Sequence, residues 1–481
     1  MNRREFLKIS MFAGAGFMAS CSLPSNRKVA VNKPNIIFIL TDDQGWADAA
    51  VYGHPYVKTP NIDRLASGGT RYTQFYVNAT VCAPSRVALM TGQYPSRNNV
   101  HHIYLNPEFD REHGMPVFLD PNVLTVADVM KQAGYTTGHI GKWHLCGREN
   151  TSPTPDEYGF DYHSVTHDGG QSKVFRERFN SSKHPVTDSS HWIMDDGIEF
   201  IEKNKDGGKP FYLNLWTLVP HGPLLPTPEE LAVYEKLQAN PEDFDGWMKE
   251  YGERAKDFTS QMKIFCAALT SLDQGIGKLL DYLDKSGLAG NTLIVFTSDN
   301  GPEDYHTGDS SNAGVGYPGL SRGRKRSLYE GGIKVPCILR WPGKVPADKV
   351  SDAVWTGVDL LPTLAAVTGV KTADSFVSDG EDVSDIWFGS SRKRKKDIFW
   401  EWKFEVGGEN DYHPPQLAIR SGDWKLFCNP DGNGVELYNI ADDSSERKNI
   451  AANYPQVTQI LKTKLLDWKK TIPEKYVYEK M

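Results

Sequence analysis

Short, continuous apolar runs recur along the first three quarters of this 481-residue chain, and helical patterns separate them. The apolar runs are NIIFIL (35–40), PFYLNLWTLV (210–219) and NTLIVFTS (291–298). A strand that helices cover on both sides reads as an unbroken apolar run, because both of its faces are buried. The chain is therefore predicted to form an α/β fold with a large, mostly parallel (mixed) sheet sandwiched by helices.

The pattern changes after about residue 390. The segment QLAIRSGDWKLF (416–427) and the segment GVELYNI (434–440) are typical of antiparallel strands, and a helical pattern covers 454–472. We expect a small C-terminal α+β subdomain at 391–481, with a short antiparallel sheet and a terminal helix, after a larger domain at 33–390. The basic run RKRKK (392–396) is interpreted as a solvated linker or surface turn, with a polyanion patch as the alternative.

The N-terminus has the features of an export signal. A basic start, MNRREFLK, precedes an apolar stretch at 9–19 that is too short to span a bilayer. Arg3 and Arg4 resemble a twin-arginine signal, and MASC, ending at Cys21, resembles a lipobox in which the cysteine is lipidated. An ordinary cleavable signal with an incidental cysteine is the alternative. Residues 1–20 are thus predicted to export the chain to the bacterial periplasm, as a soluble protein or as a lipoprotein anchored to the membrane.

Charge and cysteine content narrow the function further. The formal net charge of −7 argues against nucleic-acid binding, although a few convergent cations still suffice for an anionic substrate. Five cysteines remain after Cys21, and their odd number and irregular spacing do not indicate a disulfide framework. Cys266 and Cys337 lie in apolar runs and are predicted to be core residues, whereas Cys82 lies at the start of a helical pattern.

Polar residues follow several of the predicted strands directly. Asp42 and Asp43 follow the first, and Asp299 and Asn300 follow the run at 291–298. Ligand and catalytic sites of open parallel sheets lie beyond the carboxyl ends of the strands. Three carboxylates and an amide there predict a hard oxygen site for Ca²⁺ or Mg²⁺, whereas each pair alone reads as a turn or a helix cap.

Cationic side chains are expected at the same edge. Lys142 and His144 follow the strand pattern at 136–141, and His221 follows the run at 210–219. Cys82 opens the segment CAPSRVALMTG, where a helix N-terminus lowers the pKa of a thiol and attracts anions. A thiolate nucleophile is one reading. A cysteine protease, however, needs a paired base and an oxyanion hole rather than a cluster of carboxylates.

These segments together resemble the type I, formylglycine-dependent sulfatases of the alkaline phosphatase superfamily, of the arylsulfatase and N-acetylgalactosamine-6-sulfatase kind. Residues 82–86 fit the family signature Cys-x-Pro-x-Arg. The other blocks occur in the family's order, and they are PNIIFILTDDQGWAD, TPNIDRLASGG, GKWH, SDNG, RGRKRSLYEGGIKVP and AIRSGDWKL…ELYNI…ERKNIA. The match extends from residue 33 to about 452.

The resemblance implies an alkaline-phosphatase-like fold for the domain at 33–390, sulfate ester hydrolysis, and a set of site residues. Cys82 would be oxidised to formylglycine by a formylglycine-generating or radical-type sulfatase-maturing enzyme. The implied metal ligands are Asp42, Asp43, Asp299, Asn300 and the modified Cys82, with Ca²⁺ as the usual ion and Mg²⁺ as the alternative. The residues implied to hold the formylglycine hydrate and the sulfate are Arg86, Lys142, His144, His221 and Lys325.

In the family mechanism one hydroxyl of the hydrate attacks sulfur, and the second lets sulfate leave with cleavage of a carbon–oxygen bond. Lys325 or His221 would protonate the departing alcohol, and His144 would take the proton from the second hydroxyl. Each of these residues also has a purely structural interpretation: the arginine and lysines as solvated side chains, His144 as a buried histidine, and His221 as a turn residue. Arg324 and Arg326 compete with Lys325 within the same basic loop.

The substrate is expected to be a sulfated polysaccharide or its oligosaccharides. Candidate substrate-binding residues are His101, His102, Asp304 and His306, with ordinary loop residues as the alternative. Aromatic residues at 400–413 and Trp424 are candidates for a wall on which a sugar stacks. Two other functions stay open at this point: a formylglycine-dependent phosphonate or phosphodiester hydrolase, and a non-catalytic binder of sulfated glycans.

Overall fold

The computed structural model describes residues 33–147, 152–166, 173–255, 257–304, 312–404 and 412–476. The predicted export signal at 1–20 and the predicted lipidation site Cys21 lie outside the described residues. Among the helices that the structure describes, none has the length and apolar character that crossing a membrane requires.

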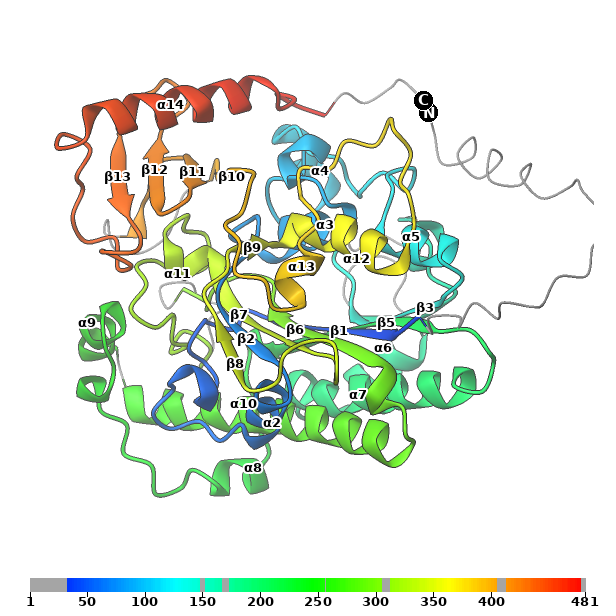
Figure 1. Ribbon diagram of the computed structural model, residues 1–481. Coiled ribbons are helices and arrows are strands. Elements are labelled where there is room, and N and C mark those ends of the chain that lie inside the picture. The colour runs from blue at the N-terminus through cyan, green and yellow to red at the C-terminus, as the bar shows by residue number, and fades with distance from the viewer. Residues whose placement is uncertain are drawn as a thin grey trace, which may run out of the picture.

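A mixed nine-stranded sheet forms the centre of the protein (Figure 1). Its strands lie in the order β4-β3-β5-β1-β6-β7-β2-β8, and β9 pairs with β2. They are β1 (Asn35–Asp42), β2 (Thr70–Tyr76), β3 (Thr136–Lys142), β4 (Tyr162–Thr166), β5 (Phe211–Pro220), β6 (Thr292–Ser298), β7 (Lys334–Arg340), β8 (Lys349–Ser351) and β9 (Trp355–Thr356). The strands from β4 to β6 are mutually parallel, and β7 runs antiparallel to its neighbours β6 and β2.

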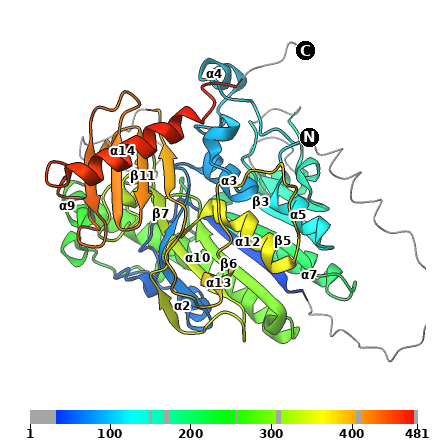
Figure 2. The same ribbon diagram turned by 45° about the horizontal axis from the view of Figure 1, so that its top comes forward.

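Helices cover both faces of this sheet, as the two views show (Figures 1 and 2). Helices α2 (Pro60–Ser67), α7 (Pro185–Asn204) and α10 (Phe258–Lys285) share an apolar core with Ile37 and Ile39 of β1. Helices α3 (Cys82–Thr91), α5 (Val126–Gln132) and α12 (Leu360–Thr368) share another with Ile36, Phe38 and Leu40. Successive residues of β1 thus enter opposite cores, which explains its unbroken apolar sequence.

Local sequence signals set the ends of these helices. The Asp257 side chain accepts a hydrogen bond from the Ser260 backbone N–H and caps α10. Thr125 and Asp128 form a capping box at the start of α5. Gly92, with φ 65°, ends α3 in the left-handed conformation that glycine adopts without steric cost. The shorter helices are α4 (Pro107–Glu112), α6 (Lys173–Ser181), α8 (Pro228–Ala232), α9 (Trp247–Arg254), α11 (Glu330–Ile333) and α13 (Ser384–Trp387).

A second, antiparallel sheet follows in the order β10-β11-β12-β13. Its strands are β10 (Ile398–Glu401), β11 (Leu417–Ser421), β12 (Trp424–Cys428) and β13 (Glu436–Asn439), and α14 (Pro455–Lys470) lies along it in both views (Figures 1 and 2). Ile419, Leu426 and Leu465 of this unit belong to the same apolar core as α3 and α12. The predicted fold class is confirmed: a mostly parallel, mixed sheet between helices, followed by a short antiparallel sheet and a terminal helix.

Candidate active site

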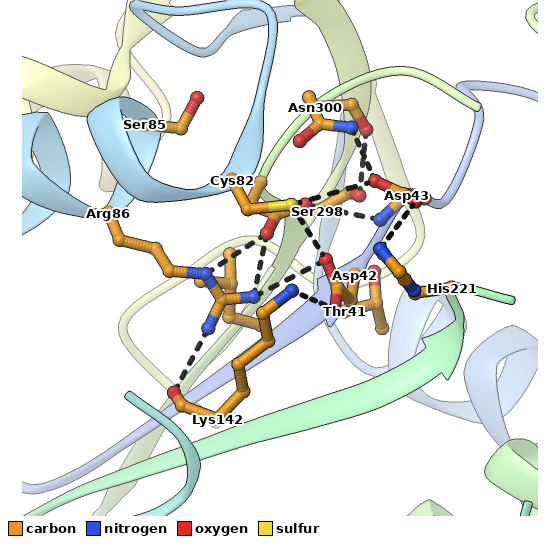
Figure 3. Close-up of polar contacts among 12 residues, drawn as sticks. Thr41, Asp42, Asp43, Cys82, Ser85, Arg86, Lys142, His221, Ser298 and Asn300 are labelled. Carbon is orange, nitrogen blue, oxygen red and sulfur yellow. Dashed lines mark hydrogen bonds and ion pairs between the residues drawn. The ribbon is translucent and has the colours of Figure 1, made fainter. Parts of the chain in front are cut away.

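The carboxyl ends of four parallel strands meet at one edge of the large sheet. β1 ends in Asp42, and β6 is followed by Asp299 and Asn300. β3 ends in Lys142, and β5 is followed by His221. Helix α3 begins at the same place, so its first residue, Cys82, lies among these side chains (Figure 3).

An acidic cluster surrounds the Cys82 thiol. Ligand atoms of Asp42, Asp43, Asp299 and Cys82 lie within 4.8 Å of one another, and all four residues are buried. The Cys82 sulfur is 3.2 Å from Asp42 Oδ1 and 3.8 Å from Asp43 Oδ1. Asp43 adopts φ 67°, a left-handed conformation that aspartate tolerates better than most residues, and its side chain thereby joins the cluster.

The donor set of this cluster fits a hard divalent cation. Three buried carboxylates converge beside the Cys82 sulfur, and Ca²⁺ prefers such oxygen ligands. The Asn300 amide extends the set. Its Nδ2 donates to Asp43 Oδ1 at 2.7 Å, while its Oδ1 is buried and has no hydrogen-bond partner among the described residues. A buried amide oxygen of this kind calls for a ligand, because leaving it unsatisfied costs free energy.

Three buried cations enclose the acidic cluster. Lys142 Nζ is 2.6 Å from Asp42 Oδ2, and Lys325 Nζ is 2.7 Å from Asp43 Oδ2. Arg86 Nη2 is 2.6 Å from Asp299 Oδ2, and its Nη1 donates to the Lys142 carbonyl oxygen at 3.0 Å. Each carboxylate therefore lies next to at least one cation, and Arg86 also lies 3.6 Å from Asp42 Oδ1, which keeps three like charges together in a buried place.

Burial and neighbouring charges shift the pKa values of the cluster in opposite directions. Burial, together with the Asp42 carboxylate, raises the pKa of Asp299 to about 7. Burial also acts to raise the pKa of Asp42, but Lys142, His221 and Arg86 hold it well below its ordinary value. A positive ion among the carboxylates would favour their ionised form, so the raised pKa of Asp299 is consistent with a cation site.

The thiol of Cys82 does not have the lowered pKa that its place at a helix N-terminus predicts. Burial raises its pKa well above the ordinary value, and Asp299 and Asp42 raise it further. The two carboxylates beside the sulfur therefore disfavour a thiolate at this position. Helix geometry alone was misleading here, because it did not include the two carboxylates that the sheet brings next to the sulfur.

The alternative of solvated side chains is also wrong for the cations. Arg86 is fully buried, Lys142 is 4% exposed and Lys325 is 3% exposed. Arg324 is buried too, but it donates to the carbonyl oxygens of Glu303, Gly314 and Gly316, and so holds its own loop together. Among the three neighbouring basic residues, Lys325 contacts the acidic cluster.

Two histidines lie at the opening of the cluster. His221 Nε2 is 3.8 Å from Asp43 Oδ2, and its Nδ1 is 2.7 Å from the Gly222 carbonyl oxygen. That carbonyl accepts a hydrogen bond from the Nδ1–H group, which leaves Nε2 as the atom that faces the site (Figure 3). His144, with φ 60°, is buried and lines the same pocket.

A pocket of about 560 Å³ opens directly above the cluster. Its polar lining includes Cys82, Lys142 and Lys325, and its apolar lining comes mainly from the loop before α4 and from α6 and α7. The lining residues are Asp42, Val81, Cys82, His102, Ile103, Tyr104, Leu105, Lys142, His144, Phe179, Pro185, Val186, Leu218, His221, Gly222, Pro223, Glu303, Lys325 and Arg326. This volume is typical of sites for small molecules.

The four candidate substrate residues do not all lie at the pocket. His102 lines the pocket and stacks on Trp402, with 5.6 Å between ring centroids. His101 and Asp304 are not among the lining residues. His101 is buried behind the wall, where Nε2 is 3.2 Å from Lys403 Nζ and Nδ1 is 3.7 Å from Glu401 Oε2. His306 lies outside the described residues.

Glu303 is a residue of this site that the sequence analysis missed. It is buried, lines the pocket, and accepts hydrogen bonds from Lys325 Nζ at 3.0 Å and from Arg326 Nη1 at 2.6 Å. Burial acts to raise its pKa, but the two cations hold it far below the ordinary value. Its position two residues after the SDNG turn was the available signal, and that signal could not distinguish Glu303 from the adjacent Asp304.

Comparisons with known proteins agree with this geometry. The family model described as Sulfatase matches residues 34–370, and the model described as N-sulphoglucosamine sulphohydrolase, C-terminal, matches 323–471. Arylsulfatase A of Bos taurus is 32% identical over 416 residues, which cover 82% of this chain and 75% of that protein. N-acetylgalactosamine-6-O-sulfatase of Bacteroides thetaiotaomicron is 27% identical over 551 residues, covering 96% and 98%. The crystal structure of Ps i-CgsB in complex with k-i-k-neocarrahexaose has a TM-score of 0.74 at 25% identity, covering 93% and 95%.

Proposed function

Because this chain belongs to the sulfatase family and is a sulfuric ester hydrolase, we propose that it removes sulfate groups from a sulfated polysaccharide or from its oligosaccharides. The observation that carries this proposal is the buried cluster of Cys82, three aspartates and three cations at the floor of a pocket of about 560 Å³. The names of two similar proteins, an N-acetylgalactosamine-6-O-sulfatase and a protein solved with neocarrahexaose, support a carbohydrate substrate.

The family is formylglycine-dependent and uses a metal, and we assign both to the strand ends. Ca²⁺ would be held by Asp42, Asp43, Asp299 and Asn300 beside the modified Cys82, and it would supply positive charge next to the sulfate. The formylglycine hydrate would supply the attacking hydroxyl. These carboxylates exclude a competing anion from the ion site and orient the residue at position 82, whose sulfur lies against two of them.

The cations bind and orient the sulfate. Lys142 and Lys325 point their ammonium groups at the cluster, and both line the pocket from which the substrate enters. Arg86 fixes Asp299 through two of its nitrogens and holds the end of β3 through the Lys142 carbonyl. Donors that are already in place stabilise charge that develops on sulfate oxygens without reorganising during the reaction.

Proton transfer requires groups at the mouth of the cluster. Lys325 or His221 would protonate the departing alcohol, since both line the pocket and lie next to Asp43. His144, which lines the pocket beside Lys142, would accept the proton that is released when sulfate leaves. His102 and the apolar residues Ile103, Tyr104 and Phe179 would contact the sugar.

Export and maturation complete the proposal. The twin-arginine-like start and the lipobox-like MASC support transport to the periplasm and lipid attachment at Cys21. The signature at 82–86 supports oxidation of Cys82 by a formylglycine-generating or radical-type maturing enzyme. A catalytic domain at 33–390 and a C-terminal subdomain at 391–481 are the proposed domains.

The proposal is tested with a panel of substrates and one peptide mass. Trypsin releases residues 72–86, and active protein should contain this peptide with the mass of an aldehyde or its hydrate at position 82. The protein should then release sulfate from sulfated oligosaccharides, and a Cys82→Ala variant should not. Hydrolysis of small aryl sulfates without any sulfated sugar would contradict the substrate class. Phosphodiester turnover well above sulfate turnover would favour the phosphonate or phosphodiester hydrolase, and binding without turnover would favour the glycan binder.

A further inference from the structure

A second pocket, of about 450 Å³, lies between the edge of the large sheet and the small sheet. We call it the basic pocket. Its lining residues are Gln74, Asp352, Ala353, Val354, Ser391, Arg392, Lys393, Arg394, Lys395, Lys396, Asp397, Ile398, Arg420, Ser421, Gly422, Asp423 and Lys464. It shares none of them with the pocket above Cys82, and it contains the whole RKRKK run. Sulfate ester hydrolysis at Cys82 does not involve the RKRKK run.

Alternate residues of the run are fixed to the protein. Arg392 binds Glu381 at 2.7 Å and Asp385 at 2.6 Å, and Arg394 forms a buried ion pair with Asp359. Lys396 Nζ donates to the Gly380 carbonyl oxygen at 2.7 Å. The backbone N–H groups of residues 395 and 396 donate to the Glu381 carboxylate. A solvated linker would not be held in this way, so the run presents its remaining side chains from a defined backbone.

The remaining two residues of the run, Lys393 and Lys395, both line the basic pocket. Both residues are exposed, and neither has an ion pair with a carboxylate in the part of the chain that the structure describes. Lys393 and Lys395 therefore offer two neighbouring ammonium groups at the rim of the basic pocket.

The floor of the basic pocket carries a further positive charge. Arg420 is buried, and its guanidinium contacts neutral groups: the Tyr76 hydroxyl, the Gln74 amide oxygen and the Gly422 carbonyl oxygen. Glu330 and Glu446 nearby are bound directly by Lys425, and Lys334 approaches Glu330. Arg420 itself forms no ion pair with a carboxylate in the part of the chain that the structure describes, so its charge is available to an anion in the basic pocket.

Strand β10 joins the basic pocket to the active-site pocket. Asp397 and Ile398, at its start, line the basic pocket. Trp402, just past its end, stacks on His102, which lines the active-site pocket. Five residues of extended chain span roughly 17 Å. A polysaccharide chain can extend over such a length, whereas a single sugar cannot.

We propose that the basic pocket is a secondary binding site for sulfated polysaccharide, in which Lys393, Lys395 and Arg420 hold a sulfate group of the chain whose other sulfate occupies the active site. The inference rests on the proposed substrate class. Asp352 and Asp423 also line the pocket and limit its positive charge, so the site adds modest, salt-sensitive affinity. Linking two weak contacts through one polymer still raises the overall affinity, because the second contact becomes intramolecular.

The test compares two double charge reversals in the full chain. Lys393→Glu with Lys395→Glu removes the rim of the basic pocket, and Lys236→Glu with Lys344→Glu is the control, since both control lysines are exposed and lie outside both pockets. Binding to dextran sulfate, with neutral dextran as a blank, should weaken about tenfold in the first variant and less than twofold in the control. The neutral pair Lys393→Gln with Lys395→Gln should lose an intermediate amount.

Activity on a small aryl sulfate should be the same in all variants, which also shows that they are folded. If both charge reversals weaken dextran sulfate binding equally, the effect is one of net charge and the proposal is overturned. Loss of binding to phosphatidylserine vesicles, with dextran sulfate binding intact, would overturn it in favour of a membrane contact. If dextran sulfate binding responds as expected but no sulfated glycan is hydrolysed, the binding site stands and the proposed substrate class fails.

Discussion

Two groups of buried charges can be compared within this molecule. The strand-end cluster consists of Asp42, Asp43, Asp299, Arg86, Lys142 and Lys325, and the inter-sheet cluster consists of Glu330, Glu446, Lys334, Lys425 and Arg420. In the inter-sheet cluster, Lys425 lies between the two glutamates, 2.8 Å from Glu330 and 2.9 Å from Glu446, so opposite charges alternate. In the strand-end cluster the carboxylates face one another and the cations lie around them.

This difference distinguishes a ligand-binding site from a cluster that only stabilises the contact between two parts of the fold. Each cluster has one carboxyl group whose pKa is raised to about 7: Asp299, through burial and Asp42, and Glu446, through burial and Glu330. The strand-end cluster lies at the floor of a pocket, where a divalent cation can relieve the repulsion. The inter-sheet cluster ties β12 of the small sheet to α11, and a proton is what relieves it. Burial of charge alone therefore does not identify the active site; the arrangement of like charges does.

The largest effect is expected from Cys82→Ala in the strand-end cluster. Sulfatase activity should fall at least about 10⁴-fold, because the precursor of the nucleophile is lost. The melting temperature should change little, since the thiol is small and neutral at this site. Cys266→Ala is the matched control: the same atoms are removed from the core of α10, so stability should fall while activity per folded molecule remains. Substantial activity in the Cys82→Ala variant would show that the strand-end cluster is not the active site.

Lys425→Met should have the reverse effect in the inter-sheet cluster. Removing the shared cation leaves Glu330 and Glu446 buried together, which should cost about 3–5 kcal/mol of unfolding free energy. Denaturant unfolding measures this loss, and activity per folded molecule should be unchanged. Lys278→Met, which breaks an exposed ion pair with Asp195, should change stability little. Equal losses in the two variants would show that the inter-sheet cluster does not stabilise the contact between two parts of the fold.

The two clusters also show which charged contacts could be predicted from the sequence and which could not. Asp42, Asp43 and Asp299 could be placed together because the apolar runs, and the polar residues that end them, are local features of the chain. The inter-sheet cluster had no such signal. Glu330 and Lys425 are 95 residues apart, and their contact depends on how the small sheet docks.

The same limit applies within the site. Which residue of a loop turns inward depends on its partners, and Glu303 does so because Lys325 and Arg326 bind it. His101 shows the opposite outcome: its partners Lys403 and Glu401 keep it out of the pocket, behind the pocket wall. Neither pairing can be read from the local sequence, because each joins segments that are distant along the chain.

The ionisation of Glu446 should be detectable in the pH dependence of the unfolding free energy. Its pKa is raised from 4.5 to about 7, so the folded protein binds a proton more tightly than the unfolded chain does. Stability is then highest below pH 4.5 with respect to this group, and it falls as pH rises through the interval up to about 7, by about 3 kcal/mol in total. Glu446→Gln should reduce the slope of the stability curve across that interval, while Asp299, whose pKa is also raised to about 7, still contributes to it. An unchanged slope in the variant would mean that another group is responsible.

Removal of calcium should affect the strand-end cluster alone. At one hundred times the dissociation constant, Ca²⁺ would stabilise the folded state by about 2.7 kcal/mol, and chelation should remove that stabilisation together with activity. Asp43→Asn should abolish the response of the melting temperature to Ca²⁺, whereas Glu330→Gln should keep it. A calcium response that persists in the Asp43 variant would place the ion elsewhere and remove the main distinction between the clusters.

The smallest effect is expected from Glu303→Gln, which tests how far the strand-end cluster extends. Glu303 binds the same Lys325 ammonium group as Asp43, so the variant should keep its fold and its calcium response but orient that group less well. For a sulfated sugar, whose alkoxide leaving group needs a proton, kcat should fall about tenfold with little change in KM. For nitrophenyl sulfate, whose leaving group needs no proton, the loss should be much smaller. Glu303→Asp should recover part of the activity. Equal losses on the two substrates would show that Glu303 does not act through proton donation by Lys325, and the cluster would then end at Asp43.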